Sequence, residues 1–309
     1  MKGGRAAMEA LLCCKIYVSE SRNQKALDAI AAVAADHSRQ APLLNVFPDN
    51  HYNRVGYTVA ARSFTPLSSH QETSSASPLK AAVLEIVGAA LSHIDLREHC
   101  GSHPRLGVID HICFHPLASA SLSAASTLAS SVASHIGSQF AVPTFLYGAA
   151  HPENRPLDSI RRALGYFSPN SDGQWSGSAG SKKLDLGSDF GPNMVHPKSG
   201  VVVVGACPWV ANYNVPVLSK DLQLGRRIAK KVSSRGGGLH AVQAMALLHG
   251  HDKIEIACNL TDIRVTSAVQ VQQEVSRLAE LEGVSTLNGY FTDFAQDEIV
   301  DMAMQKLCQ

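Results

Sequence analysis

The sequence predicts an α+β fold in which the order β-α-β-β-α-β occurs twice along the chain. Short apolar runs typical of strands alternate with segments whose apolar residues recur at helical spacing. The same order of elements is present in both halves, although the halves share no obvious sequence repeat. Apolar residues make up 45% of the 309 residues and charged residues 17%, which is ample material for the cores of about two domains.

The first half begins with a buried strand that leads into a capped helix. Its apolar run ends in Ser-Glu-Ser, which suits the N-terminus of a helix. Pro48, Asp49 and Asn50 then supply the turn of a hairpin. The elements in order are a strand, a helix, two strands, a helix and a strand, at 11–18, 27–34, 43–47, 54–60, 79–94 and 106–114. This is the split β-α-β, or ferredoxin-like, unit.

Three more elements and a loop complete the first half. We expect a helix at 122–136 with Gly137 as its stop, a strand at 142–147 and a short helix at 156–164. From 168 to 188 the chain is rich in Ser, Gly and Asp, which predicts a long surface loop. The first subdomain is therefore placed at 1–199.

The second subdomain is placed at 200–309, with the same order of elements. Ser219 is expected to cap its first helix and Gly283 to end its second. The segment 240–248 fits a helix or a strand, and we favour a strand because Gly250-His-Asp makes a turn into the next strand. The elements in order are a strand, a helix, two strands, a helix and a strand, at 201–214, 222–232, 240–248, 253–258, 269–279 and 284–291.

Charge and cysteine content exclude several classes of protein. With 27 basic and 26 acidic residues, the net charge is +1, and the chain lacks the basic excess of a general nucleic-acid binder. Seven cysteines, with Cys13 and Cys14 adjacent and no C-x-x-C, indicate reduced thiols rather than a disulfide framework. Glu9 interrupts the apolar N-terminal stretch, and no apolar run approaches the roughly 18 residues of a membrane span. We therefore expect a soluble, cytoplasmic protein without nucleic-acid or membrane partners.

Potential metal ligands are concentrated in one short stretch of the chain. They are His99, Cys100, His103, His111, Cys113 and His115. On a strand the last three share one face, because side chains alternate. The spacing His-x-Cys-x-His matches no closed tetrahedral site, and no H-E-x-x-H is present. We therefore expect these histidines to lie on the exposed face of a sheet, and we expect no metal.

His103 differs from the other histidines in its surroundings. It lies in Gly101-Ser-His-Pro-Arg-Leu-Gly, directly before an apolar strand, where Pro104 restricts the backbone. A histidine at the mouth of a strand can exchange protons near neutral pH. Arg105 offers a guanidinium group that can bind a carboxylate through two hydrogen bonds. The segment is thus either a proton-transfer site or an ordinary surface loop.

Seven short motifs follow one another over nearly the whole chain. They are Cys14-Lys-Ile-Tyr-Val-Ser-Glu-Ser-Arg-Asn, Asn53-Arg-Val-Gly-Tyr-Thr, Gly101-Ser-His-Pro-Arg-Leu-Gly-Val-Ile-Asp, Phe145-Leu-Tyr-Gly, Asp189-Phe-Gly-Pro, Asn212-Tyr-Asn and Cys258-Asn-Leu-Thr-Asp. In this order they resemble the glutamate formiminotransferases, the folate-dependent enzymes of histidine breakdown. The resemblance leaves no room for the cyclodeaminase domain that accompanies the transferase in the bifunctional enzyme.

This resemblance implies two ferredoxin-like subdomains with facing sheets, helices outside and a folate tunnel between them. It implies transfer of a formimino group from N-formiminoglutamate to tetrahydrofolate, the acceptor substrate, and a homodimer as the assembly. His103 falls on the histidine that donates and accepts a proton in the family. The remaining folate and substrate contacts fall on Asn53, Arg54, Arg105, Gly191, Pro192, Asn193, Met194, Val195, His196, Pro197, Lys198, Ser199, Gly200, Asn214 and Asn259.

Two positions depart from the family pattern in ways that concern the chemistry. An active-site Asn of the family is Tyr17 here, and the Asp that supports the catalytic histidine is Phe47. A phenyl ring can neither orient an imidazole nor stabilise its charged form. The alternatives to a formimino transferase are therefore a folate-binding protein that has lost transfer activity, or an enzyme that transfers or cyclises a formyl group on folate.

Overall fold

The computed structural model describes residues 9–63, 77–167, 184 and 186–309. The chain divides into two compact units. The first comprises Met1–Pro208 together with Asp297–Gln309, and the second comprises Trp209–Gln296. Each unit has one β-sheet and its own hydrophobic core.

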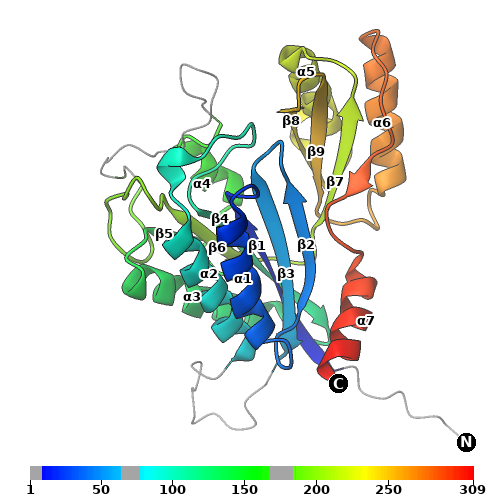
Figure 1. Ribbon diagram of the computed structural model, residues 1–309. Coiled ribbons are helices and arrows are strands. Elements are labelled where there is room, and N and C mark those ends of the chain that lie inside the picture. Colours follow the sequence, from blue (N-terminus) through cyan, green and yellow to red (C-terminus); the bar gives the residue numbers. More distant parts are fainter. Residues whose placement is uncertain (1–8, 64–76, 168–183, 185) are drawn as a thin grey trace, which may run out of the picture. The chain divides into compact units, whose positions relative to one another are not determined.

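The first unit contains a six-stranded mixed sheet in the order β2-β3-β1-β4-β6-β5 (Figure 1). The strands are β1 (Ala10–Val18), β2 (Leu43–Asp49), β3 (Arg54–Arg62), β4 (Ile109–Ala118), β5 (Thr144–Gly148) and β6 (Val202–Ala206). Its helices are α1 (Gln24–Asp36), α2 (Pro78–His93), η2 (Leu96–Glu98), α3 (Leu122–Gln139), α4 (Leu157–Ala163) and α7 (Gln296–Leu307). The first four strands are antiparallel, and β6 pairs in parallel with both β4 and β5.

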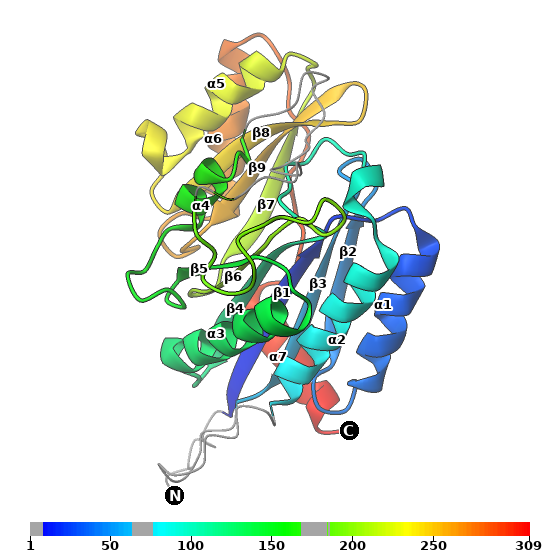
Figure 2. The ribbon, with the colours of Figure 1, turned by 90° about the vertical axis from the view of Figure 1, so that its left-hand side faces the viewer.

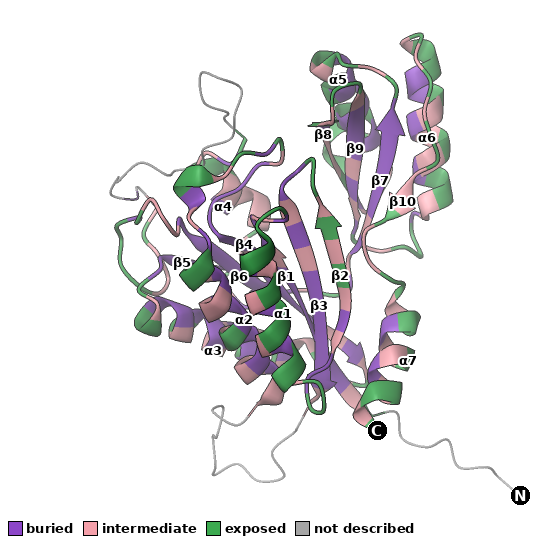
Figure 3. Ribbon diagram, viewed as in Figure 1, coloured by how far each residue is buried: buried purple, intermediate pink, exposed green. Residues whose placement is uncertain are grey.

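Helices cover one face of this sheet, and the strands alternate accordingly. In β1, Leu12, Cys14 and Ile16 belong to the core formed with α1, α2 and α3. The alternate residues Lys15 and Tyr17 point to the opposite face, because side chains alternate along a strand. Figure 2 shows α1, α2 and α3 on one side of the sheet and α7 on the other, and in Figure 3 the exposed residues of α1 and α2 lie on their outer side. The face without α1–α3 carries the polar side chains described below.

The second unit has a four-stranded antiparallel sheet in the order β10-β7-β9-β8. Its elements are β7 (Ala211–Val217), α5 (Leu222–Val232), η3 (Ser234–Gly236), β8 (Val242–His249), β9 (Lys253–Leu260), α6 (Ala268–Leu281) and β10 (Tyr290–Phe291). This is the predicted order β-α-β-β-α-β, and the ambiguous segment 240–248 is a strand, as we favoured. That the two sheets face one another stays a prediction.

The largest difference from the expected elements lies at 201–214. This segment forms two strands rather than one, because β6 pairs in the first sheet and β7 in the second. Cys207, Pro208 and Trp209 lie between them, so the compact units divide at Pro208 and not at residue 199. A continuous apolar pattern does not reveal such a change of sheet.

Gly137 does not end its helix, and this prediction is wrong. Helix α3 continues to Gln139. A Cβ atom on Gly137 would lie 2.5 Å from the backbone N of Gly191 and 2.7 Å from the Cβ of Phe190. The glycine therefore permits the close approach of another segment rather than the end of a helix.

Smaller differences concern the second unit and the C-terminus. Asp221 rather than Ser219 caps α5, since its carboxylate accepts the backbone N–H of Gln223 at 2.8 Å. Of the strand expected at 284–291, only β10 forms. Helix α7 was not predicted. The loop expected at 168–188 lies largely outside the described residues.

In the described part of the chain, no helix combines the length and the apolar character needed to cross a membrane. All seven cysteines are described, and no disulfide links them.

Candidate active site

His103 lies in the loop between η2 and β4, and backbone contacts fix that loop. The N–H of Leu96 donates to the carbonyl of Lys198 at 2.9 Å, and the N–H of Val108 donates to the carbonyl of Ser199 at 2.9 Å. A Cβ atom on Gly101 would lie 2.2 Å from the carbonyl oxygen of Tyr52. Only glycine permits so close an approach, so the loop has a defined position in the first unit.

The imidazole of His103 is oriented by a backbone carbonyl and enclosed by tyrosine rings. Its Nδ1 lies 2.6 Å from the carbonyl oxygen of Pro104. Nδ1 therefore carries the proton and donates a hydrogen bond to this carbonyl. The lone pair of the neutral ring is then on Nε2. The rings of Tyr52 and Tyr166 approach edge-on, with centroids 5.2 Å and 6.5 Å from that of His103.

Burial makes His103 a neutral base. It lowers the pKa of the imidazole well below its usual value, and the positive charges of Arg54 and Arg161 add to the effect. The hydrogen bond to the Pro104 carbonyl opposes the shift. The neutral ring is the form that accepts a proton from a substrate.

Two arginines beside His103 share one carboxylate. Arg54 Nη1 donates to Asp110 Oδ2 at 2.7 Å, and Arg161 lies 4.0 Å from the same oxygen. The other oxygen, Asp110 Oδ1, accepts the N–H of Leu106 at 2.7 Å. Two guanidinium groups against one carboxylate leave an excess positive charge next to His103, which suits an anionic substrate.

Arg161 is the site residue that sequence reasoning missed. It lies on α4, and its guanidinium carbon is 4.3 Å from the centroid of the Tyr166 ring. The neighbouring Arg162 pairs instead with Asp158 on the exposed side of the helix. Nothing in the local sequence distinguishes these two adjacent arginines, so no signal marked Arg161.

Tyr17, which stands where the family has an Asn, contacts Arg54 of the arginine pair. The Arg54 guanidinium carbon lies 4.8 Å from the centroid of the Tyr17 ring. The Tyr17 ring also stacks on the imidazole of His111. The two ring centroids are 5.5 Å apart and the ring planes are inclined by 12°. A Cβ atom on Gly56 would lie 3.3 Å from this ring. Phe47 pairs across the strands with Gly56, so it lies on the same face of the sheet as Tyr17.

Arg105, expected to bind a carboxylate, is turned into the loop. Its side chain is buried, and Nη2 donates to the carbonyl of His99 at 3.1 Å. Burial lowers the pKa of this guanidinium to about 10. The geometry gives Arg105 a part in holding the loop.

Asn53 also has a role in local structure. It adopts a left-handed backbone conformation with φ of 50°, and its Oδ1 accepts the backbone N–H of Ser21 at 2.8 Å. Its Nδ2 lies 3.4 Å from Nδ1 of His99, which itself lies 2.9 Å from the carbonyl of Ser19. Asn53 thus joins the β2–β3 turn to the end of β1.

The segment Gly191–Gly200 lies alongside the His103 loop. Gly107 and Gly200 form a backbone bridge, and a Cβ atom on Gly107 would lie 2.1 Å from the carbonyl oxygen of Val201. Asn193 Oδ1 accepts the N–H of Ser188 at 2.9 Å, and Met194 is 59% exposed. The described structure therefore brings the predicted folate segment and the predicted catalytic histidine together within one unit.

Asn214 and Asn259 belong to the second unit, on the sheet face opposite its helices. Asn214 Nδ2 donates to Glu255 Oε2 at 3.1 Å, and Tyr290 donates its hydroxyl to Glu255 Oε1 at 2.6 Å. Asn259 Oδ1 accepts an N–H of Asn212 at 2.6 Å. Both amides therefore belong to a hydrogen-bonded polar face.

The histidines of β4 are less exposed than the sequence predicted. His115 is 1% exposed, so the expectation of an exposed sheet face is wrong for this histidine. Cys113, two residues earlier, is 3% exposed. His111 Nε2 lies 2.7 Å from the hydroxyl of Tyr147 on β5. The ring of Tyr147 passes over Gly205 of β6, where a Cβ atom would lie 2.2 Å from Tyr147 Cε1. The glycine therefore lets a residue of β5 reach across β6 to β4.

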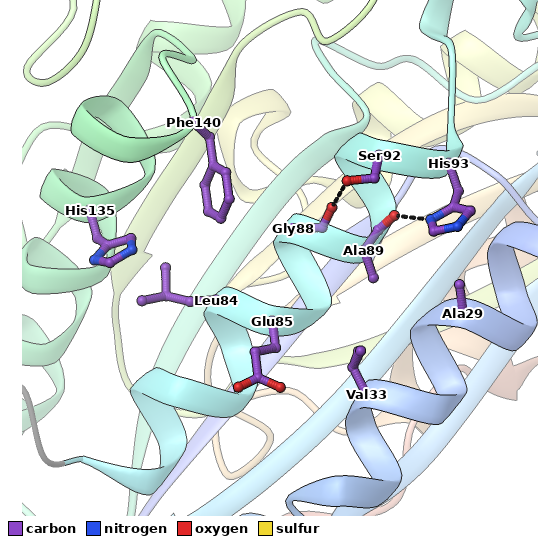
Figure 4. Close-up of a pocket in the computed structure, with 10 residues that line it drawn as sticks. All are labelled: Ala29, Val33, Leu84, Glu85, Gly88, Ala89, Ser92, His93, His135 and Phe140. Carbon is purple, nitrogen blue, oxygen red and sulfur yellow. Dashed lines mark hydrogen bonds between the residues drawn. The ribbon is translucent and has the colours of Figure 1, made fainter.

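A groove of about 470 Å³ lies elsewhere in the first unit, between α1, α2 and α3 (Figure 4). Its walls are largely apolar, with Val33, Leu84 and Phe140 among them. Ser92 donates its hydroxyl to the carbonyl of Gly88 at 2.8 Å, and His93 Nδ1 lies 2.9 Å from the carbonyl of Ala89. These polar groups are used by their own helix, and nothing in the groove matches the chemistry at His103.

Together, the fold and the His103 site define a protein suited to proton transfer on an anionic substrate. Comparison with known proteins gives the family. The formiminotransferase domain, N-terminal subdomain, matches residues 11–207. The chain therefore belongs to the formiminotransferase family, as its motifs indicated.

Three relatives illustrate the range of the family. The chain is 50% identical over 300 residues to a formiminotransferase cyclodeaminase-like protein of Arabidopsis thaliana, which covers 97% of this chain and 98% of the relative. It is 28% identical over 302 residues to a glutamate formimidoyltransferase of Thermoplasma acidophilum. That match covers 95% of this chain and 91% of the relative. It is also 28% identical over 282 residues to a formimidoyltransferase-cyclodeaminase of Rattus norvegicus, covering 88% of this chain and 48% of that protein.

Proposed function

We propose that this protein transfers a formimino group from N-formiminoglutamate to tetrahydrofolate, with His103 as the catalytic residue. The observation that carries the proposal is the neutral imidazole of His103 beside two arginines that share one carboxylate. The distant relatives named glutamate formimidoyltransferase support the same reaction. No metal is needed for the steps that follow.

The reaction needs one proton to be moved. A folate nitrogen attacks the formimino carbon and loses a proton, which Nε2 of His103 accepts. The bond between that carbon and the glutamate nitrogen then breaks, and His103 returns the proton to the departing amine. One neutral histidine thus serves as base and then as acid. Arg54 and Arg161 would hold a carboxylate of the donor.

The folate contacts are proposed on both units. In the first unit they comprise the segment Gly191–Gly200, with Asn53 and Arg105 supporting the loop on which His103 lies. In the second unit they comprise Asn214 and Asn259 on the polar sheet face. Polar side chains on an otherwise apolar scaffold are the usual means of orienting a ligand of this size.

A second candidate is a folate-binding protein without transfer activity, and a specific observation favours it. Phe47 stands where the family has the acid that supports the histidine, and His103 is oriented instead by the carbonyl of Pro104. A carbonyl fixes the tautomer but stabilises an imidazolium less than a carboxylate does. Formyl transfer to folate, or cyclisation of a formyl-folate, would use the same groups.

The test combines a turnover assay with calorimetry on the full chain. Formiminoglutamate and tetrahydrofolate are supplied together, and release of glutamate is followed; folate binding is measured separately. Turnover and binding support the transferase. Binding without turnover supports the folate-binding protein. Turnover only when a formyl donor replaces formiminoglutamate supports formyl transfer or cyclisation, the third candidate. The absence of both binding and turnover would remove all three.

A further inference from the structure

Three potential metal ligands that the proposed reaction does not use meet where β4 lies beside the end of β6. Cys113 and His115 lie two residues apart on β4 and share one face of the sheet. Cys113 pairs with Gly205 of β6, and Cys207 follows that strand. The parallel register therefore brings Cys207 to two ligands that lie more than 90 residues earlier in the chain.

The distances among the donor atoms form a compact triangle. The Sγ atoms of Cys113 and Cys207 are 3.3 Å apart, and Nδ1 of His115 lies 3.9 Å and 3.8 Å from them. In a tetrahedral zinc site, with Zn–S of about 2.3 Å and Zn–N of about 2.0–2.1 Å, ligand atoms are separated by roughly 3.5–3.8 Å. The triangle thus has nearly the size of one face of such a tetrahedron.

The chemistry of the donors selects the kind of ion. Thiolates and imidazole bind zinc and similar thiophilic ions, whereas calcium and magnesium prefer oxygen ligands. Two cysteines and one histidine, with a fourth position left for water or another ligand, are an established set for zinc.

Burial and charge are consistent with bound thiolates. Cys113 and His115 are almost fully buried, as is Lys15, which pairs with Cys113 across β1 and β4. Buried thiolates require positive charge nearby. The ammonium of Lys15 supplies part of it, and a divalent ion would supply the rest.

We propose that Cys113, His115 and Cys207 form a binding site for a thiophilic divalent metal ion of the zinc class. On binding, both thiols release their protons. The Nδ1 atom of His115 lies 3.1 Å and 3.0 Å from the carbonyl oxygens of Cys207 and Pro208, so in the metal-free protein it donates its proton there. That proton moves to Nε2 when Nδ1 binds the ion, and the imidazole stays neutral.

The ion would tie the end of β6 to β4, close to Pro208, where the chain leaves the first unit. This proposal does not depend on the transfer reaction, because none of its three residues has a role there. It also differs from a disulfide, since a sulfur–sulfur bond is about 2.05 Å long and these sulfurs are two separate thiols.

The test uses the full chain, freed of metal with a chelator under reducing conditions and then titrated with Zn²⁺ or Co²⁺. We expect one ion per chain and, with Co²⁺, the absorption band of thiolate-to-cobalt charge transfer. The spectrum reports sulfur ligation in the unaltered protein, so the result does not depend on a variant that folds. Removing a residue that only hydrogen-bonds to a metal ligand already lowers the metal affinity by about 10–100-fold. Cys113→Ser, Cys207→Ser and His115→Asn should each therefore weaken binding by at least about 100-fold.

Cys258→Ser is the matched control, because Cys258 is also a buried strand cysteine but lies in the second unit. It should leave the metal affinity unchanged. Failure of the reduced protein to bind either ion would overturn the proposal, as would unchanged binding in the Cys113→Ser/Cys207→Ser double variant. A protein that is isolated with these two cysteines disulfide-linked, and stays metal-free after reduction, would also overturn it.

Discussion

His103 shows how much of a site one residue's surroundings determine. Its place before an apolar strand left a proton carrier and an ordinary surface loop open, and only the resemblance to the family favoured the proton carrier. The orientation of its ring depends on the carbonyl of the next residue, Pro104. The charges that act on it come from Arg54 and Arg161, more than 45 residues away along the chain on either side. Such long-range partners follow from packing, which is why Arg161 could not be predicted from sequence.

His103→Ala tests the proton-transfer role at the residue scale. We expect turnover to fall by about 10²–10⁴-fold, the usual contribution of general acid–base catalysis, with a modest change in folate affinity. Initial rates and calorimetry measure the two quantities. His93→Ala, which removes an exposed histidine of α2, is the control and should leave both unchanged. Unchanged turnover in His103→Ala would show that another group moves the proton.

Phe47→Asp asks whether the missing acid limits the reaction. Phe47 lies across β3 from Tyr17, on the face of the sheet that carries the arginine pair. A carboxylate placed there should stabilise the charged form of His103 and raise turnover. Asparagine has nearly the same shape as aspartate but carries no charge, so Phe47→Asn should raise turnover less than Phe47→Asp. Equal rates for the two variants would mean that charge at this position does not matter.

His99 predicts a pH dependence of stability. Burial, followed by the charge of Arg105, lowers the pKa of His99 to about 3. The unfolded chain binds a proton at this histidine below about pH 6.5 and the folded chain does not, so stability should fall as the pH decreases from about 6.5 towards 3.

The variant His99→Asn retains a donor for the carbonyl of Ser19 but does not titrate. Urea denaturation at about pH 7 and about pH 4.5 should therefore show a smaller loss of stability in this variant than in the unaltered protein. His93→Asn should show the same loss as the unaltered protein. Equal pH dependence in all three proteins would rule out His99 as a source.

At the scale of elements, the apolar run of β1 and the apolar stripe of α2 were strong enough to predict both from sequence. Two glycines have structural reasons that the sequence does not show. Gly137 lies within its helix and leaves room for the segment at Phe190 and Gly191, and Gly205 leaves room for the ring of Tyr147. In both cases the reason for glycine is a neighbour distant in sequence. A local pattern cannot distinguish such a glycine from a stop or a turn.

Gly205→Ala tests the crossing of Tyr147 over β6. The added Cβ would lie 2.2 Å from the ring, so the ring must move and its hydroxyl must leave His111. We expect a loss of about 1–3 kcal/mol in the free energy of unfolding, as for other overpacked sites. Denaturation in urea measures it.

The double variant Gly205→Ala/Tyr147→Leu should be more stable than the sum of the two single changes predicts, because one change relieves the clash made by the other. Gly187→Ala is the control, since no atom lies within 4 Å of the added Cβ. A simple sum of the two single effects would show that the clash is avoided in another way.

At the scale of the whole molecule, the chain completes its first unit last. It leaves that unit at Pro208, forms the second unit, and returns with Asp297. Helix α7, which makes this return, buries only Ile299 and Ala303, so its apolar pattern is too sparse to predict. Lys306 Nζ donates to the carbonyl of Leu43 at 2.8 Å and helps to hold the helix on the first unit. The expected homodimer stays a prediction, which light scattering on the full chain can test.

If α7 is a structural part of the first unit, loss of its buried contacts should destabilise the protein. Ile299 is fully buried, and Ile299→Ala should cost about 2–5 kcal/mol, the usual effect of removing a large side chain from a core. Leu281→Ala is the control: this leucine ends α6 and is 71% exposed, so its loss should change stability by less than about 0.5 kcal/mol. Unfolding of both variants is measured in urea. Because the two units have separate cores, they can unfold in two separate transitions, and the comparison then uses the transition of the unit that carries the substitution. Equal stability of the two variants would mean that α7 contributes little to the fold, and that the first unit is complete at Pro208.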